Sequence, residues 1–542
     1  MTVRVGWALG LVVGAWAGPL AAQQISPPPR TIDTIVIITQ DPFTPDEAEG
    51  KALFRAMNKL HITTKLKVIF DELLFRVGEP FDPVKVQESE RNLRTREIFK
   101  SVRLDTATVG GKFAVIVDTQ DGWTTKPNLR FSVATDGTWT GRFGLTESNL
   151  LGRGNLASAA FVKEVDRQGL ELAANFRRIG GSQVRAKGLA TFWNDGRDGW
   201  WRAGDPFYSN LDRLAIDYDG QAAGRRVLRY RVDSAGTDTT EYRRAASINR
   251  LWGGFATTAR PTRYLRLGAQ GEIRQEKFVL VQDTGMAVPD SVYGVVGLWA
   301  EYQRTRFAEM RYFNGFGTED IDVSTRIRLI LNIAPDAWGY ASNGVGPQLE
   351  AAWGSAGRRG FFAAVLKANA LFNDAGLDSG RVVFDLTLGT KFAERHSTAL
   401  HIEGGVLENP PPGEEFDLGF NTPPRSWGAH SFVGTRAIWG TLEHRWYPLE
   451  ALFKLISLGF AAFLDYGGAW YPDQEARFGG NIGIGLRPGG ALGTAARTGR
   501  IDIGYRFGEG ADQGGRLVLT FGGSIVFPWN KDAGALVKKD GP

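Results

Sequence analysis

The feature that most constrains this chain is an alternation of apolar and polar residues that recurs between residues 123 and 527. In one stretch, apolar side chains or threonine occupy every second position: Val323, Thr325, Ile327, Leu329, Leu331 and Ile333. Most positions between them are polar or charged: Asp322, Ser324, Arg326, Arg328 and Asn332. Residues two apart share one face of a β-strand, so the pattern predicts strands with one apolar face and one polar face.

A transmembrane β-barrel with a wet lumen is the architecture that carries apolar side chains outside and charged side chains inside. A soluble sandwich has the reverse orientation, and alternation alone does not separate the two. The length of the array does, because about 400 residues in strands about 10 residues long are too many for one sandwich. Glycine, at 69 of 542 residues, adds the turns and strand kinks that such an array needs.

The first 22 residues resemble a secretory signal peptide. Arg4 precedes an uncharged run that ends at Ala22, where we expect cleavage. The alternative is an uncleaved membrane helix, but the run is short for a span, and Gly10, Gly14, Gly18 and Pro19 make it a poor helix. We therefore expect an exported mature protein without a helical membrane span.

The composition argues against most enzymes. The chain has no cysteine, which excludes disulfide scaffolds, thiolate zinc sites and cysteine nucleophiles, and it has 5 histidines. His401-Ile402-Glu403 resembles the start of a zinc deaminase motif whose cysteines are missing here, and His396 lies five residues away, on the opposite face of a strand. A net charge of +5 without a clustered basic face does not fit a nucleic-acid binder. We expect no enzyme, no cofactor and no metal site.

Residues 31–120 have a mixed α and β pattern. A β-branched strand near residues 32–38 precedes a helix predicted over 46–60, with Ala48, Leu53, Phe54, Met57 and Leu60 as its buried face. A second helix is predicted from Asp82, an N-cap aspartate followed by Pro83. Two strands joined by Gly110-Gly111 follow, so the order is strand, helix, helix, strand, strand.

This order resembles a POTRA domain, a periplasmic module of outer-membrane assembly and secretion proteins. Three sequence segments support the resemblance: IFDELLFRVGEPFD (69–82), ESERNLR (88–94) and IFKSV (98–102). The alternative is an ordinary small α+β domain. One copy fits before Asp121, whereas family members that assemble other barrels often carry several.

Two phrases resemble the BamA/TamA group of barrels, also called the bacterial surface antigen family. TESNLLGRGN (146–155) is similar to an early hairpin of these barrels; its G-x-G-x-x-A spacing is not a dinucleotide site, because a strand and not a helix is predicted to follow. RSWGAHSFVGTR (425–436) is similar to their sixth extracellular loop, although Ser426 and Trp427 depart from the usual glycine and tyrosine or phenylalanine.

In that family, the sixth loop folds into the lumen and its arginine pairs with an acidic wall residue. The resemblance implies this role for Arg425 and makes Gly434 and Arg436 part of the motif. Asp465, in a Phe-x-Asp-x-Gly strand, is the first candidate partner and Asp502 the second, because alternation turns both inward. The alternative for Arg425 is a loop arginine in solvent.

The last predicted strand carries a pattern by which barrels are recognised for insertion. It is a polar residue, a glycine, an apolar residue and an aromatic residue, represented by Thr520, Gly522, Ile525 and Phe527. A tail (528–542) rich in Lys, Asp and Gly follows. The adjacent glycines at 522 and 523 are expected to weaken the pairing of this strand.

The sequence thus predicts a mainly β protein: a signal peptide (1–22), an α+β POTRA domain (31–120) in the periplasm, a barrel (123–527) and a tail (528–542). The resemblance implies a 16-stranded antiparallel transmembrane β-barrel in the bacterial outer membrane, within the known range of strand numbers. It also implies help in the insertion or translocation of other proteins, with a seam between a first strand near 128–134 and a last strand at 516–527.

The implied partners are outer-membrane lipid and lipopolysaccharide, unfolded outer-membrane or secreted client proteins, and periplasmic chaperones or accessory proteins. Two alternatives stay open. One is a two-partner secretion pore, which normally has two POTRA domains and a plug helix. The other is a passive porin or surface barrel, in which a POTRA domain has no clear role.

Overall fold

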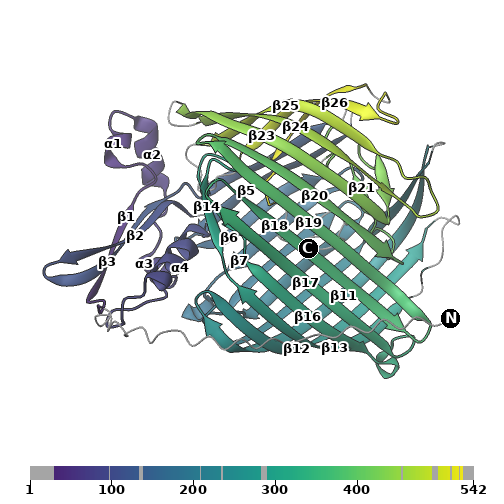
Figure 1. Ribbon diagram of the computed structural model, residues 1–542, viewed down its shortest axis with the longest axis horizontal. Coiled ribbons are helices and arrows are strands. Elements are labelled where there is room, and N and C mark those ends of the chain that lie inside the picture. The colour runs from purple at the N-terminus through teal and green to yellow at the C-terminus, as the bar shows by residue number, and fades with distance from the viewer. Residues whose placement is uncertain are drawn as a thin grey trace, which may run out of the picture.

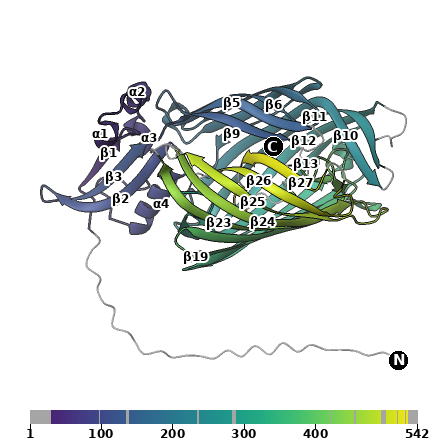
Figure 2. The same cartoon turned by 90° about the horizontal axis from the view of Figure 1, so that it is seen from above.

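The computed structural model describes residues 30–528, except for 97, 134–137, 208, 234–235, 282–287, 289, 421, 453–455, 491–497, 513–514 and 524. The predicted signal peptide, and the predicted tail beyond Pro528, lie outside the described residues. Within them, a small α+β unit lies at one end of a large closed barrel (Figures 1 and 2). No helix among the described residues is both long enough and apolar enough to cross a bilayer.

The N-terminal unit is a three-stranded sheet with helices packed against it. Its elements are β1 (Thr34–Gln40), α1 (Pro45–Ala48), α2 (Ala52–Leu60), α3 (Leu66–Phe70), α4 (Pro83–Arg94), β2 (Phe99–Val109) and β3 (Lys112–Asp121). The strand order is β1-β3-β2, with β1 parallel and β2 antiparallel to β3. The predicted order of strands and long helices is present, with short helices added to it.

Residues 46–60, predicted as one helix, form two. Gly50 separates α1 from α2 and has a φ of +69°, in the left-handed region that ends a helix. The break changes which face is buried. Phe54 is buried as predicted, whereas Leu53 and Leu60 are 59% and 75% exposed.

Helix α4 starts at the predicted cap. The Asp82 carboxylate accepts a hydrogen bond from the backbone N–H of Val84 at 2.9 Å, and Pro83 fills the first helical position. The N–H groups of the first helical turn have no partner within the helix. Asp82 accepts a hydrogen bond from one of them, and Pro83 has no N–H that needs a partner. Val86 and Leu93 then face the sheet as part of the apolar core.

Twenty strands form the barrel, and consecutive strands are antiparallel. They are β4 (Thr125–Val133), β5 (Trp139–Leu150), β6 (Asn155–Lys163), β7 (Gln168–Phe176), β8 (Arg185–Trp193), β9 (Gly196–Asp205), β10 (Leu214–Asp233), β11 (Gly236–Arg260), β12 (Arg263–Leu280), β13 (Ser291–Arg304), β16 (Thr325–Ala334), β17 (Gly344–Gly357), β18 (Gly360–Asn373), β19 (Gly376–Ala393), β20 (His396–Glu408), β23 (Arg436–Leu452), β24 (Ile456–Trp470), β25 (Gly479–Gly490), β26 (Gly499–Gly508) and β27 (Leu517–Gly523). The last strand, β27, lies beside β4 and closes the sheet.

Two hairpins lie outside the barrel sheet, each within one connection. One consists of β14 (Phe307–Arg311) and β15 (Thr318–Asp322), and the other of β21 (Phe416–Leu418) and β22 (Phe432–Gly434). Two short 3₁₀ helices, η1 (Ile179–Gly181) and η2 (Asp336–Trp338), occur in other connections.

The prediction of sixteen strands is wrong for this structure, which has twenty in the barrel. Several connections are two-residue turns, in which the last residue of one strand pairs directly with the first of the next, as in Trp193 with Gly196 and Asn373 with Gly376. Such turns use few residues. The same length of chain can therefore form more strands than the sixteen that the family resemblance implied.

The two faces of the barrel differ as the alternation predicted. On β16, Ile327, Leu329 and Leu331 are exposed on the outside, whereas Asn332 is buried inside. The same division holds on β26, where Ile503 is exposed outside. An apolar exterior around a polar interior is what a bilayer requires of a barrel.

The N-terminal unit contacts the barrel through the turn between β5 and β6, which lies within the phrase TESNLLGRGN. The backbone N–H of Lys65 donates to the Gly152 carbonyl at 2.9 Å, and the Asn149 amide donates to the Thr64 hydroxyl at 2.9 Å. Gly152 has a φ of +70°, and a Cβ there would lie 2.6 Å from the Thr63 carbonyl oxygen. The phrase is therefore a docking turn, and its glycine allows the close approach.

The same contact covers a charged pair of the N-terminal unit. Arg96 and Glu72 form a buried ion pair at 2.5 Å, and Arg96 also donates to the Gly154 carbonyl at 3.4 Å. Burial raises the pKa of Glu72, although the positive charge of Arg96 opposes the shift. The barrel turn thus helps to remove this pair from water.

We predict that a fragment of residues 30–122 folds without the barrel, because it contains its own sheet and core. Leu93→Ala should lower its free energy of unfolding by about 2–5 kcal/mol, since Leu93 is fully buried. The exposed Leu60→Ala is the matched control and should change it by about 0.5 kcal/mol or less. Urea unfolding followed by circular dichroism measures both. A fragment without a cooperative transition would contradict the prediction.

Candidate functional site

The connection between β20 and β23 (residues 409–435) turns back into the barrel. Its hairpin β21–β22 and Trp427 pack against the inner wall, in a cluster of buried apolar side chains. The cluster consists of Val383, Leu407, Phe416, Leu418, Trp427, Phe432, Ala437, Trp439, Ala469 and Ala511. We call this connection the lumen loop.

Arg425 of the lumen loop is 1% exposed, and three carboxylates surround its guanidinium. Nε and Nη2 donate to Asp465 Oδ2 and Oδ1 at 2.7 and 2.9 Å. Nη1 donates to Glu443 Oε2 at 2.7 Å and to Asp502 Oδ2 at 3.3 Å. The guanidinium also lies over the ring of Phe463, 4.1 Å from its centroid. The structure therefore brings Arg425 together with both aspartates that the sequence singled out.

The acidic residues come from neighbouring strands of the wall. Glu443 lies on β23, Asp465 on β24 and Asp502 on β26, all on the inner face. Glycines of the wall leave room for the cluster. A Cβ at Gly485 of β25 would lie 1.9 Å from Asp502 Oδ1, and one at Gly504 would lie 2.1 Å from Ser426 Oγ. The glycine content of these strands is thus part of the site.

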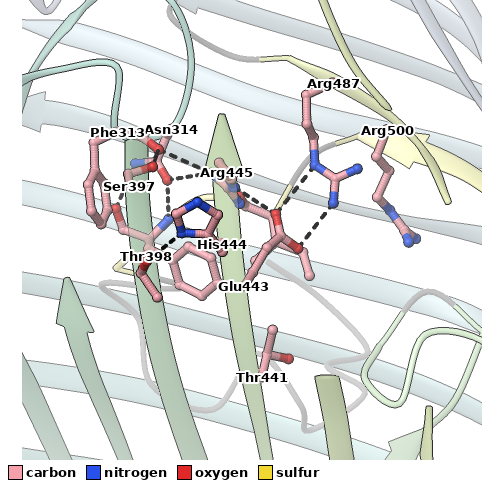
Figure 3. A network of polar contacts seen from close by, with 12 residues as sticks. Phe313, Asn314, Ser397, Thr398, Thr441, Glu443, His444, Arg445, Arg487 and Arg500 are labelled. Atoms are coloured by element: carbon pink, nitrogen blue, oxygen red, sulfur yellow. Dashed lines mark hydrogen bonds and ion pairs between the residues drawn. The ribbon is translucent and has the colours of Figure 1, made fainter. Parts of the chain in front are cut away.

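Three more arginines complete the cluster, and the sequence analysis did not identify them. Arg487 contacts Asp502 at 2.5 Å and Glu443 at 3.1 Å; Arg500 donates to Asp502 at 3.0 Å; Arg445 donates to Glu443 at 2.6 Å. Figure 3 shows Arg445 and Arg487 on either side of Glu443. Alternation on β23 could have identified Glu443 and Arg445 as inward-facing.

The chemistry of this cluster is that of a clamp. Each carboxylate already accepts charge-assisted hydrogen bonds from guanidinium groups, which are the strong class of protein hydrogen bonds. Four arginines face three carboxylates, so the places where a metal cation would bind are taken. The arrangement fixes the lumen loop to the wall.

The other residues of the loop motif differ in where they lie. The Ser426 N–H donates to Asn481 Oδ1 at 3.2 Å, and the Trp427 indole donates to the Gly480 carbonyl at 3.0 Å, so both lie on the inner wall. Gly434 lies against Trp470, whose carbonyl carbon would be 2.0 Å from an added Cβ. Arg436 lies apart from the cluster, at the start of β23, and pairs with Glu408.

A second group of segments enters the lumen from the end that carries the N-terminal unit. The tip of the β14–β15 hairpin buries Phe313 and Asn314. The Asn314 side chain forms two hydrogen bonds of 2.7 Å with the backbone of Phe527, one with its carbonyl oxygen and one with its N–H. Arg445 donates to Asn314 at 3.1 Å and to the carbonyl of Ile525. The two groups of segments therefore meet at Arg445 and Glu443.

The predicted insertion signal is divided between the wall and the lumen. Thr520 and Gly522 lie on β27, where they pair with Asp502 and Arg500. Ile525 and Phe527 do not continue the strand, which ends at Gly523 rather than at 527. Both are buried in an apolar cluster with the hairpin tip, so the last strand is shorter than the predicted 516–527. The asparagine and arginine contacts hold the chain inside instead.

No family model matches the sequence, and no curated protein matches it. Among solved structures, the chain is similar to BamA from Haemophilus ducreyi lacking POTRA domains 1–3, at 12% identity and a TM-score of 0.38, with 90% of this chain and 84% of that chain covered. It is similar to CdiB from Escherichia coli (11%, TM-score 0.44, 93% and 92% covered) and to CdiB from Acinetobacter baumannii (12%, 0.43, 92% and 73%). The chain thus resembles BamA- and CdiB-type barrels over most of its length, at scores too low to transfer a function.

We predict that Arg425→Ala destabilises the barrel by about 3–5 kcal/mol, because it leaves buried carboxylates without their central cation. Asp465→Ala should cost less, since Glu443 and Asp502 still face Arg425. The double variant should be little worse than Arg425→Ala alone. The free energy of unfolding of all three variants is measured by urea unfolding in detergent, with the folded fraction read from heat-modifiable migration on gels.

The matched control is Arg436→Ala, which removes another arginine of the same motif. Its partner Glu408 is half-exposed, so the change should cost about 0–1 kcal/mol. Strictly additive losses for the Arg425 and Asp465 variants would show that the two side chains do not interact.

Proposed function

We propose that the chain is an outer-membrane barrel of the BamA/TamA type, which assists the insertion or translocation of other proteins. The sequence phrases at 69–82, 146–155 and 425–436 support this proposal, together with the fixed lumen loop. In it, the N-terminal unit is a periplasmic POTRA domain. The end of the barrel that carries this unit faces the periplasm, and the lumen loop enters from the cell surface.

The observation that carries the proposal is the way in which the barrel closes. The last strand, β27, has seven residues and is the shortest of the twenty. Its neighbour β4 has nine residues, so part of the edge of β4 extends beyond the strand that closes the barrel. A strand edge with unused N–H and C=O groups is a template for another strand.

The segments that occupy part of the lumen favour protein handling over passive diffusion, although β11–β19 line a polar cavity beside them. Apolar side chains of the lumen loop, Phe313 of the β14–β15 hairpin tip and Phe527 are buried inside the barrel. A porin conducts small solutes through an open aqueous channel. Here apolar packing and ion pairs hold side chains of the lumen loop and of the hairpin tip in part of the passage.

The test is depletion of the protein in its own bacterium, followed by quantitative comparison of the outer-membrane proteome. We predict a broad loss of β-barrel proteins from the outer membrane and their appearance, unfolded, in the periplasm. A plasmid copy of the wild type should reverse the loss, the Arg436→Ala variant should do so equally well, and the Arg425→Ala variant should not.

Two results would contradict the proposal. Loss of one secreted protein, with barrel proteins unchanged, would identify a dedicated exporter. An unchanged proteome with reduced uptake of small solutes would identify a passive pore.

A further inference from the structure

Four lumen-facing residues of β19 and β20 form a compact polar group that contains no member of the arginine cluster. Asp385 pairs directly with Glu403 across the two strands, and Thr387 pairs directly with His401. All four side chains are buried, whereas Phe384 and Leu388, which flank Asp385 and Thr387 in the alternation, are exposed on the outer face. Directly opposed residues of antiparallel strands have Cβ atoms about 4.5–5.5 Å apart, so their side chains meet.

The distances within the group suit a metal ion. His401 Nε2 lies 2.9 Å from Asp385 Oδ2 and 3.9 Å from Glu403 Oε2. One ligand atom from each of the three residues lies within 4.8 Å of the others. Two ligands of one zinc ion, each bonded at about 2.0–2.2 Å, can be at most about 4.4 Å apart, so a small adjustment brings all three onto one centre.

Thr387 supplies an independent observation. Its side chain is 0% exposed, and its hydroxyl has no hydrogen-bond partner among the residues that the structure describes. It lies on the same face as Asp385, two positions along β19, and opposite His401. A buried hydroxyl costs free energy when it has no partner. A hydrated cation between these side chains would give it one.

Aromatic rings cover His401, and Asp385 borders a cavity. Trp439 packs against the His401 ring at a centroid distance of 4.7 Å, and the Phe527 ring lies 6.2 Å from it. Asp385 also lines a lumen cavity together with Pro528. The cavity beside Asp385 gives room for a water molecule as a fourth ligand, and three protein ligands with one water are the usual form of a zinc site that is not fully closed.

We propose that Asp385, His401 and Glu403 bind one divalent transition-metal ion, Zn²⁺ or Mn²⁺, with Thr387 in contact with its bound water. One imidazole and two carboxylates suit these ions, and antiparallel pairing holds the ligands on a rigid wall. The site is independent of the proposed function. Sequence reasoning missed it because Asp385 lies sixteen residues from His401 and only the strand register brings them together.

The test uses the full chain, purified in detergent and stripped with EDTA. Zn²⁺ and Mn²⁺ are titrated in separate calorimetric experiments, and bound metal is measured by mass spectrometry after dialysis. We expect one equivalent of one of these ions to bind. Asp385→Asn, His401→Gln and Glu403→Gln should each weaken binding at least about tenfold. Heat-modifiable migration shows that each variant is folded.

The matched control is His396→Gln, a histidine of the same strand on its outer face. It should leave the affinity unchanged. Absence of stoichiometric binding by the wild type would overturn the proposal, and so would binding that the three ligand variants do not weaken. Binding lost in His396→Gln would place the metal on the outer surface, where His396 contacts His444, and would overturn it equally.

Discussion

The interior of this barrel depends on one electrostatic constraint: a guanidinium that is removed from water must be surrounded by negative charge. Moving an ion into a low-dielectric site costs several kcal/mol even after the protein relaxes. Arg425 offsets that cost with Asp465, Asp502 and Glu443, which lie on different strands. The charge of Arg425 is therefore balanced only when the lumen loop lies in this position and the wall strands keep this register.

Glu443 links the two ends of the barrel, because it binds Arg425 from the lumen loop and Arg445 from its own strand. Arg445 contacts Asn314 at the tip of the β14–β15 hairpin, and the strands of this hairpin lie beside the N-terminal unit (Figure 1). There Arg94 of α4 binds Asp320 of β15 at 3.1 Å. A continuous path of contacts thus joins the N-terminal unit to the loop at the opposite end. If the N-terminal unit or the lumen loop moves, the contacts of Glu443 and Arg445 have to change with it.

Sequence reasoning identified what depends on local pattern. Alternation predicted the two faces of the strands and turned Asp465 and Asp502 inward, and the phrase around Arg425 supplied the cation. It could not supply the strand number, which depends on connections as short as two residues, or the inward path of Ile525, which depends on contacts with Arg445 and the hairpin tip. These contacts join segments that are far apart in the chain, so they cannot be predicted from a local sequence pattern.

The most direct test of the clamp is a disulfide between the lumen loop and the wall, in a chain that has no cysteine of its own. A Cβ at position 504 would lie 3.2 Å from Ser426 Cβ, near the separation of about 3.5–4.5 Å in disulfides. Ser426→Cys with Gly504→Cys should cross-link in native membranes, whereas Ser426→Cys with the outward-facing Ile503→Cys should stay reduced. If both cysteines of the first pair stayed reduced and reacted with a maleimide added from outside, the lumen loop would not be clamped.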